Sequence, residues 1–262
     1  TKVRARFGGR LKALVSGGAP LNYDIGVFFT ALGLRILQGY GQTEAAPVIS
    51  CNPPSNVKID TVGPSVVDVD VKIAEDGEIL VRGELVMQGY WKDDGATAQA
   101  IRDGWLHTGD IGELDADDYI RITDRKKDII VNSGGDNISP QRVEGFLTVQ
   151  PEIAQAMVYG DNRPHLVALV VPDEEFVRDW AYAHDRPTEL GELTNDSDFR
   201  QAISEVIDRV NASLAVIERV RRFTIATEPF TIENALLTPS FKIRRHKITD
   251  IHLNTLEALY GH

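Results

Sequence analysis

The side chains best suited to chemistry lie between residues 40 and 44. Tyr40-Gly41-Gln42-Thr43-Glu44 places an aromatic ring, a flexible glycine, a hydroxyl and a carboxylate in one short segment. The ring can stack on a nucleobase, Gly41 lets the backbone approach a ligand closely, and Thr43 with Glu44 can reach a phosphate and its Mg²⁺. The segment therefore indicates a nucleotide site. The alternative is a turn that ends a strand and carries a surface acid.

Two more segments carry groups suited to the same ligand. Asp110 follows Gly109 at the end of a predicted β segment. Its two carboxylate oxygens can accept hydrogen bonds from the two hydroxyls of a ribose, unless it only caps a turn. Arg125 lies in the charged run Asp124-Arg125-Lys126-Lys127-Asp128, where it is either a second ligand contact or solvated surface.

A single lysine near the C-terminus, Lys242, follows a proline-containing turn and precedes a basic segment expected to be helical. A flexible ammonium on a loop can neutralise oxygen charge that builds up on a phosphate or carboxylate. The alternative is that Lys242 and the arginines after it form a solvated basic face.

The elements that would position these residues follow from the apolar runs. Residues 11–15 predict a buried strand that leads into the loop Ser16-Gly17-Gly18-Ala19-Pro20. A helix is expected over residues 22–32, and a second strand over residues 34–38 ends at Gly39. Two strand ends with two glycine loops are typical of an α/β sheet that forms a crevice at its strand ends.

The rest of the chain divides at the charged run 124–128, which we take as a domain boundary. Before it, short β segments predict a small antiparallel β subdomain: residues 69–74, 78–82, 111–114 and 119–122. After it, strands and helices alternate and predict a compact α+β domain: strands 129–131, 154–159 and 166–171, and helices 140–149, 174–183 and 198–214.

The composition bounds the class of protein. The 262 residues are 42% hydrophobic and 26% charged, which suits one large domain or two small ones. A formal charge of −11 argues against a broad hold on nucleic acid, so no nucleic-acid partner is expected and a phosphate-bearing substrate would need a local cationic site. The single cysteine, Cys51, excludes an internal disulfide framework and fits a reducing, cytoplasmic location. No apolar run reaches the roughly 18 residues of a membrane span, so any membrane contact of the whole protein is expected to be peripheral.

Taken in order, these segments resemble the adenylate-forming superfamily of acyl-CoA synthetases, firefly luciferase and peptide-synthetase adenylation domains. Residues 16–21 are similar to the family's Gly-Gly-Ala-Pro-Leu segment, and residues 38–44 are similar to its Gly-Tyr-Gly-x-Thr-Glu motif. The resemblance implies that Tyr40 packs on adenine, Thr43 contacts the α-phosphate and Glu44 coordinates Mg²⁺. It implies further contacts around the nucleotide from Gly18, Ala19, Gln38, Gly39 and Gly41.

The resemblance continues to the C-terminus. Residues 83–90 are similar to a structural signature of the β subdomain, residues 108–110 to the ribose-binding motif, and residues 124–128 to the hinge motif. Asp110 and Arg125 are then ribose contacts, and Lys127 falls on the hinge position. The implied domains are residues 1–124 as the end of the large N-terminal domain (51–124 its β subdomain), a hinge at 125–128 and a mobile C-terminal domain at 129–262.

Residues 133–140 resemble the family's loop that lines the tunnel for the pantetheine arm of coenzyme A. Gly134 and Gly135 fall in that loop, and Asp136 replaces the commoner glutamate. Lys242 falls on the family's catalytic lysine, although Phe241 stands where most members have glycine. The sequence Leu-Thr-Pro-Ser-Phe-Lys resembles the long-chain fatty acyl-CoA ligase branch.

The implied reaction has two steps: a fatty acid and ATP give acyl-adenylate, and coenzyme A then displaces AMP. Lys242, Thr43 and Glu44 are the implied catalytic residues. The family's Ser/Thr/Gly-rich phosphate loop is absent from the sequence, so the chain is expected to be a fragment that is inactive alone and that associates with itself through its uncovered face. The alternatives are an adenylation domain that loads a carrier protein and a catalytically silent AMP-binding fragment. A dinucleotide oxidoreductase is disfavoured because no Gly-x-Gly-x-x-Gly opens a helix.

Overall fold

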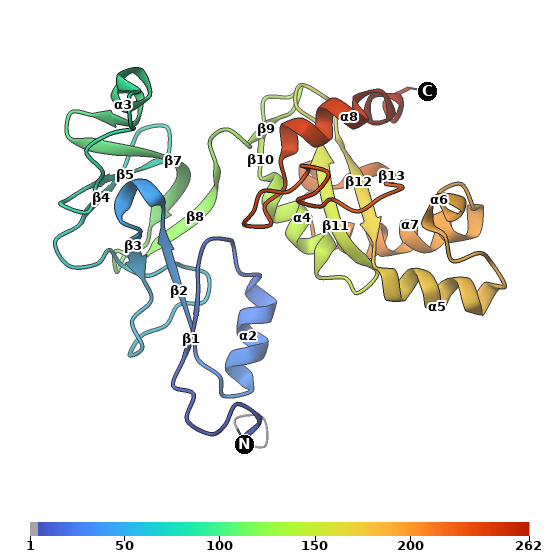
Figure 1. The fold of residues 1–262 in the computed structure, drawn as a ribbon, viewed down its shortest axis with the longest axis horizontal. Coiled ribbons are helices and arrows are strands. Elements are labelled where there is room, and N and C mark those ends of the chain that lie inside the picture. The colour runs from blue at the N-terminus through green and yellow to red at the C-terminus, as the bar shows by residue number, and fades with distance from the viewer. Residues whose placement is uncertain (1–4, 262) are drawn as a thin grey trace. The chain divides into compact units, whose positions relative to one another are not determined.

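The computed structural model describes residues 5–261. The chain divides into two compact units, with the boundary in the sequence between Lys127 and Asp128, and each unit is described by itself (Figure 1). Both units mix helices with small sheets, which confirms the expected α/β and α+β class. In the described part of the chain, no helix is both long enough and apolar enough to span a bilayer.

The first unit begins with a strand, a helix and two strands: β1 (Leu14–Ser16), α2 (Tyr23–Ala31), β2 (Ile36–Gly41) and β3 (Val48–Cys51). The predicted order is confirmed, although β1 begins three residues later than expected. Asn22 sets the start of α2, because its side chain accepts hydrogen bonds from the N–H groups of residues 24 and 25 at 2.9 and 3.2 Å.

Strand β1 runs parallel to β2, and β3 runs antiparallel to β2. The prediction that the second strand ends at Gly39 in a glycine loop is wrong, because β2 continues to Gly41 and its last residues pair with β3. Ser16 lies opposite Gln38, so the loop after β1 leaves the sheet beside the middle of β2. The end of β1 is where an α/β sheet of this kind would offer a ligand its strand ends.

The rest of the first unit is the predicted antiparallel β subdomain. Its sheet has the order β4-β5-β7-β6, with β8 also paired to β7, and consists of β4 (Asp70–Ile73), β5 (Glu78–Arg82), β6 (Ile101–Arg102), β7 (Trp105–Leu114) and β8 (Ile120–Arg125). The short helix α3 (Asp94–Ala100) precedes β6, and the 3-10 turn η1 (Thr43–Ala45) joins β2 to β3. Ile79, Val81, Leu106 and Ile120 fill the core of this unit, and Tyr40 joins them from β2.

The structure also corrects the prediction for the strand that carries Asp110. The prediction that Gly109 ends a β segment, with a separate strand at 111–114, is wrong, because β7 runs from Trp105 to Leu114 without a break. Gly109 has φ +71°, a conformation that glycine adopts without steric cost. The strand therefore bends at Gly109 and continues through Asp110.

The second unit is built on a three-stranded sheet, with β12 (Leu166–Pro172) between β11 (Ile153–Tyr159) and β13 (Val220–Ile225). Every residue of β12 is buried, because its alternate side chains enter two separate cores. One core holds the apolar faces of α4 (Pro140–Thr148), α5 (Glu174–His184) and α7 (Ser197–Asn211), beside the short α6 (Leu190–Leu193) and η2 (Val216–Glu218). The other holds Phe230, Leu236 and α8 (Arg245–Ala258). A two-stranded ribbon, β9 (Ile130–Val131) with β10 (Asn137–Ile138), precedes α4.

Candidate functional site

Three of the predicted nucleotide residues meet in the first unit. The hydroxyl of Tyr40, on β2, donates to Asp110 Oδ2 on β7 at 2.6 Å. Arg125 Nε, at the end of β8, lies 3.1 Å from Asp110 Oδ1. Asp110 is 4% exposed and pairs in register with Arg125 across the two strands. Segments far apart in the sequence thus converge on one carboxylate.

The surroundings fix the ionisation of this trio. Burial, with the Asp110 carboxylate next to it, raises the pKa of Tyr40 far above its ordinary value. The Tyr40 hydroxyl therefore keeps its proton and remains a donor. Each oxygen of a carboxylate has two acceptor positions, so Asp110 retains acceptor capacity after it has bound Tyr40 and Arg125. It can accept from the hydroxyls of a ribose in an orientation that is already set.

A second buried carboxylate, Glu78, holds β7 at Gly109, the residue before Asp110. Glu78 Oε1 accepts from the N–H of Gly109 at 2.9 Å, and Glu78 Oε2 lies 3.0 Å from His107 Nδ1 and 3.1 Å from Lys126 Nζ. Burial alone would raise the pKa of Glu78, but these three groups outweigh it and lower the pKa. The N–H of Lys126 also donates to the Gly109 carbonyl at 2.9 Å, which ties β7 to the segment before Lys127. Lys127 itself is exposed.

Glu44 lies on η1 and is held by a residue whose motif indicated only a structural role. The hydroxyl of Tyr90 donates to Glu44 Oε1 at 2.9 Å, and the N–H of Met87 donates to the Glu44 carbonyl at 2.8 Å. Thr43, the residue before it, is exposed. The carboxylate of Glu44 is thus oriented while its second oxygen has no protein partner among the described residues.

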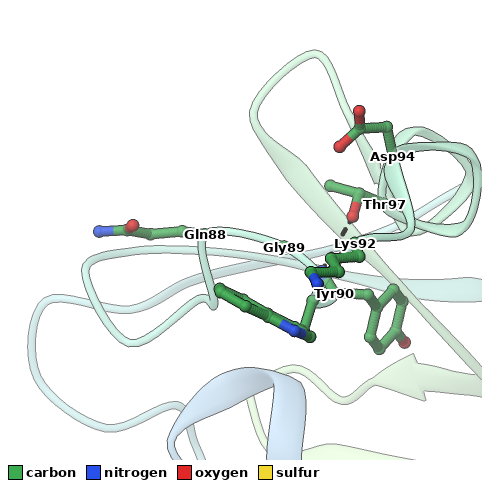
Figure 2. A pocket seen from close by; sticks show the side chains of 7 residues that line it. Gln88, Gly89, Tyr90, Lys92, Asp94 and Thr97 are labelled. Carbon is green, nitrogen blue, oxygen red and sulfur yellow. Dashed lines mark hydrogen bonds between the residues drawn. The ribbon is translucent and has the colours of Figure 1, made fainter.

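Tyr90 also lines a shallow pocket of about 290 Å³ between residues 88 and 97. Figure 2 shows the Thr97 side chain turned toward the backbone of Tyr90. Thr97 Oγ1 accepts a hydrogen bond from the Tyr90 N–H at 2.9 Å. The Trp91 side chain in this pocket is 88% exposed. Because Tyr90 binds Glu44, this pocket adjoins the expected metal ligand.

The remaining predicted contacts of the first unit divide into two groups. Gly18 (φ +81°) and Ala19 lie in the exposed loop after β1. Gly41 is needed for close packing, since a Cβ there would lie 1.6 Å from the Pro47 carbonyl oxygen. Gly39 is packed less tightly, because its Cβ would lie 3.2 Å from the Ser50 carbonyl oxygen. The Gln38 side chain is buried and donates to the Ile59 carbonyl, so it supports the sheet.

Lys242, Gly134 and Gly135 lie in the second unit. Lys242 is exposed at the end of a tight turn, in which the N–H of Thr238 donates to the Lys242 carbonyl at 2.8 Å and the N–H of Lys242 donates to Thr238 Oγ1 at 3.1 Å. Phe241 precedes it with φ +59° and a side chain that is 75% exposed. The turn thus keeps the backbone of a glycine although it carries phenylalanine.

The Gly134-Gly135 loop is organised by Asn132, a residue that was not among the predicted site residues. Asn132 Oδ1 accepts from the N–H groups of Gly134 and Asp136, each at 2.9 Å, and Asn132 Nδ2 donates to Asp136 Oδ2 at 3.0 Å. Asparagine often closes a turn by bonding backbone groups two residues ahead, and that tendency was the available signal. For Tyr90 and Glu78 the sequence offered no such local signal.

Comparison with known proteins gives these features a context. Residues 1–91 match the profile of the AMP-binding enzyme family, and residues 127–262 match the profile of the AMP-binding enzyme C-terminal domain. Long-chain-fatty-acid–CoA ligase FadD15 of Mycobacterium tuberculosis (strain H37Rv) is 38% identical over 262 residues, which are 99% of this chain and 44% of that protein. The chain spans less than half the length of the curated relatives it matches.

Solved structures agree with the sequence relatives. The adenylation domain of the carboxylate reductase from Mycobacterium chelonae superposes with a TM-score of 0.81 at 28% identity, over 100% of this chain and 41% of that one. The corresponding domain from Segniliparus rugosus, in complex with AMP and a carboxylic acid, gives 0.79 at 26% identity over the same shares. With the two profile matches, these likenesses show that the chain belongs to the family of AMP-binding enzymes.

Proposed function

We propose that the chain is the C-terminal part of an AMP-forming long-chain fatty acyl-CoA ligase. The observation that carries the proposal is the buried Asp110 carboxylate, oriented by Tyr40 and Arg125 as an acceptor for ribose hydroxyls. The substrate class comes from the relatives, which are named long-chain-fatty-acid–CoA ligases and match this chain over nearly all of its length.

In the first step, the fatty carboxylate attacks the α-phosphate of ATP and pyrophosphate leaves. Asp110 and Arg125 would hold the ribose, Tyr40 would support the adenine side, and Thr43 would contact the α-phosphate. Lys242 would neutralise the oxygens shared by carboxylate and phosphate, so the chain contributes position and charge.

Mg²⁺ would arrive with ATP. Among the described residues, no three His, Cys, Asp or Glu side chains form a metal site. The oriented carboxylate of Glu44 nevertheless suits Mg²⁺, which proteins commonly hold through one or two carboxylates together with substrate phosphates and water. The ion would offset the charge of the polyphosphate.

In the second step, the thiol of coenzyme A attacks the acyl carbon and AMP leaves. A rotation about Lys127 would withdraw Lys242 and bring the Gly134-Gly135 loop to the acyl centre, where glycines leave room for a pantetheine arm.

We place the whole enzyme in the cytoplasm, with any membrane contact peripheral. On α2, Tyr23, Val27 and Phe28 are exposed; an upstream segment would cover them in the whole enzyme, and the isolated chain would self-associate there.

The function is tested with the complete enzyme, of which this chain would form the C-terminal part. Pyrophosphate release is measured with ATP and straight-chain carboxylic acids of graded length, and thioester formation is then measured with coenzyme A. We expect both activities to be highest with long-chain acids. No release with any acid would contradict the proposal, and transfer to a carrier-protein thiol but not to coenzyme A would favour an adenylation domain like those of the carboxylate reductases.

The role of Lys242 is tested by Lys242→Ala in the same enzyme. Because the ammonium is needed where charge builds up in adenylation, pyrophosphate release should fall about 100-fold or more. Thioester formation from supplied acyl-adenylate should remain within about 3-fold of the unsubstituted enzyme, since Lys242 is withdrawn in that step. Equal losses in both steps would contradict the assignment.

A further inference from the structure

An ion pair in the second unit joins two helices across the edge of the sheet. Strand β11 is an edge strand, so the backbone groups of Val158 that face away from β12 need other partners. The Val158 N–H donates to Glu144 Oε1 at 2.8 Å, and its carbonyl accepts from Arg245 Nη1 at 2.9 Å. Arg245 Nη2 donates to Glu144 Oε2 at 2.9 Å. Glu144, Arg245 and Val158 thus close a ring of hydrogen bonds, which we call the α4–α8 clasp.

The clasp is largely removed from solvent. The side chain of Glu144 is 10% exposed and that of Arg245 is 20% exposed. Arg245 Nη2 lies 2.8 Å from Glu144 Oε1 and 2.9 Å from Oε2, so one guanidinium nitrogen contacts both oxygens. Because Nη1 binds the Val158 carbonyl at the same time, the orientation of the guanidinium is fixed as well as its distance. A buried ion pair contributes little to stability compared with a well-packed apolar pair, so geometric specificity is the property that it supplies best.

The two ends of the clasp lie on the helices that follow, in the sequence, the two loops assigned to the two half-reactions. Arg245 is the first residue of α8 and follows Lys242 by three positions. Glu144 is on α4, which begins at Pro140, directly after the ribbon that encloses Gly134 and Gly135. The clasp therefore joins α8, the helix that follows the Lys242 turn, to α4, the helix that follows the Gly134-Gly135 loop.

The turn that carries Lys242 needs such an anchor. Its tip is exposed at Ser240, Phe241 and Lys242. At its base, the N–H of Arg244 donates to the Leu236 carbonyl at 2.8 Å, and Leu237 forms an isolated bridge with Ile243. Beyond these bonds, Arg245 makes the next side-chain attachment of the turn to the sheet.

We propose that Glu144 and Arg245 are positioning residues that hold Lys242 for the adenylation step. Neither contacts substrate; both act by fixing the start of α8 on the sheet edge. The inference rests on the proposed function of Lys242 and adds the residues that make its delivery precise. A displacement of about 1 Å in a catalytic group can lower a rate about 100-fold, so loss of the clasp should lower the adenylation rate.

The test compares Glu144→Gln with Glu152→Gln in the complete enzyme. Glu152 is a matched control, because it also binds one arginine nitrogen with both oxygens, at 2.8 and 2.9 Å from Arg209 Nη2, but joins α7 to the turn before β11. Assayed at a pH above the raised pKa of Glu144, where the carboxylate is charged, Glu144→Gln should lower kcat for pyrophosphate release about 10- to 100-fold. The KM values for ATP and fatty acid, and thioester formation from supplied acyl-adenylate, should change less than about 3-fold. Glu152→Gln should leave both steps unchanged.

A second variant keeps the test decisive if Glu144→Gln does not fold. Arg245→Lys keeps the positive charge but cannot bind Glu144 and the Val158 carbonyl together as a guanidinium does, so it should show the same split in a milder form. Equal losses in both steps, no loss in either, or failure of both variants to fold would overturn the clasp as a positioning device. If the unsubstituted enzyme releases no pyrophosphate, the proposed function fails, and the clasp falls with it.

Discussion

At position 241 the backbone and the side chain favour different residues. Phe241 has φ +59°, a region that costs a residue with a side chain about 1 kcal/mol or more. The residue is 75% exposed, so burial returns little of that cost. Phenylalanine, where the resemblance led us to expect glycine, thus leaves the turn intact, and the strain persists next to Lys242.

Phe241→Gly should therefore raise the free energy of unfolding by up to about 1 kcal/mol, whereas Phe241→Val, β-branched at the same φ, should lower it by about 1–2 kcal/mol. Urea unfolding of the chain, followed by far-ultraviolet circular dichroism, measures both changes. If glycine destabilised as much as valine, backbone strain would not govern this position.

The ionisation of Glu144 gives the clasp a dependence on pH. Burial raises the pKa of Glu144 from 4.5 to about 7, although Arg245 and the Val158 N–H oppose the change and Asp128 adds to it. Between these values the folded carboxyl keeps a proton that the unfolded chain has lost. The stabilisation from this group is complete below the unfolded pKa and is lost as the pH rises through the folded pKa.

The stability of the unsubstituted chain relative to Glu144→Gln should accordingly decrease from about pH 4.5 to about pH 7.5, because glutamine mimics the protonated carboxyl throughout. Urea midpoints of the two chains across this range supply the measurement. A difference independent of pH would show that Glu144 has no raised pKa. A pair that costs stability where the pH ionises it fits a positioning role better than a stabilising one.

For single residues, the sequence predicted which side chains belong to the site better than it predicted their hydrogen-bond partners. The structure brings Tyr40, Asp110 and Arg125 together as the motifs suggested, because each lies in a segment with a recognisable pattern. The hydrogen bond from Tyr90 to Glu44 and the support of Gly109 by Glu78 were not predictable, since both join positions tens of residues apart through side chains that also suit a surface.

Among the elements, hydrophobic period and turn chemistry located most strands and helices. Asn22 and Ser139 mark the starts of α2 and α4, as their capping side chains indicate. Strand β13 was not predicted, because its charged pair, Arg221 and Arg222, interrupts the apolar run. The strand is held by its parallel pairing with β12, which the local sequence does not reveal. Gly109 was taken for the end of a strand because a bulge and a turn use the same residue.

The connection between β2 and β3 shows how closely one element constrains another. A Cβ at Gly41 would lie 1.6 Å from the Pro47 carbonyl oxygen, which belongs to the backbone and cannot move alone. Because η1 with Glu44 lies inside this connection, forcing β2 and β3 apart would also displace the expected metal ligand.

Gly41→Ala should lower the free energy of unfolding of the first unit by about 3 kcal/mol. Gly145→Ala is the control: a Cβ added at this helical glycine would meet no other group within 4 Å, so alanine there should stabilise α4 by about 0.5–1 kcal/mol. Urea unfolding of each variant gives the comparison. If Gly41→Ala left the free energy of unfolding unchanged, β2 and β3 could separate at little cost.

For the whole molecule, the expected function needs two units that change their relation during the cycle. The nucleotide groups Tyr40, Asp110 and Arg125 lie in the first unit, and Lys242 with Gly134 lies in the second. One pocket wall cannot serve both half-reactions, since adenylation needs an ammonium where thioester formation needs an open path for pantetheine. The segment that ends the first unit at Lys127 is therefore the place where a backbone rotation would exchange the walls.

Lys126 makes the position of that rotation specific. Its side chain is bound to Asp76 and Glu78, and its N–H is bound to Gly109, whereas Lys127 makes no such bond among the described residues. A swivel is thus expected one residue after the last anchored one. Lys127→Pro fixes φ near −65° and restricts the residue before it, so a rotation through that bond would be blocked.

In the complete enzyme, Lys127→Pro should leave one half-reaction running and stop the cycle. We expect pyrophosphate release in a single turnover within about 3-fold of the unsubstituted enzyme, and acyl-CoA formation lowered about 100-fold, because the acyl-adenylate forms and cannot meet the glycine loop. Lys127→Ala removes the side chain but keeps the backbone free, and should support both steps. Rapid-quench measurement of acyl-adenylate and acyl-CoA separates the two outcomes. An unchanged overall rate in Lys127→Pro would place the pivot elsewhere, and a loss shared by the alanine variant would assign the effect to the ammonium.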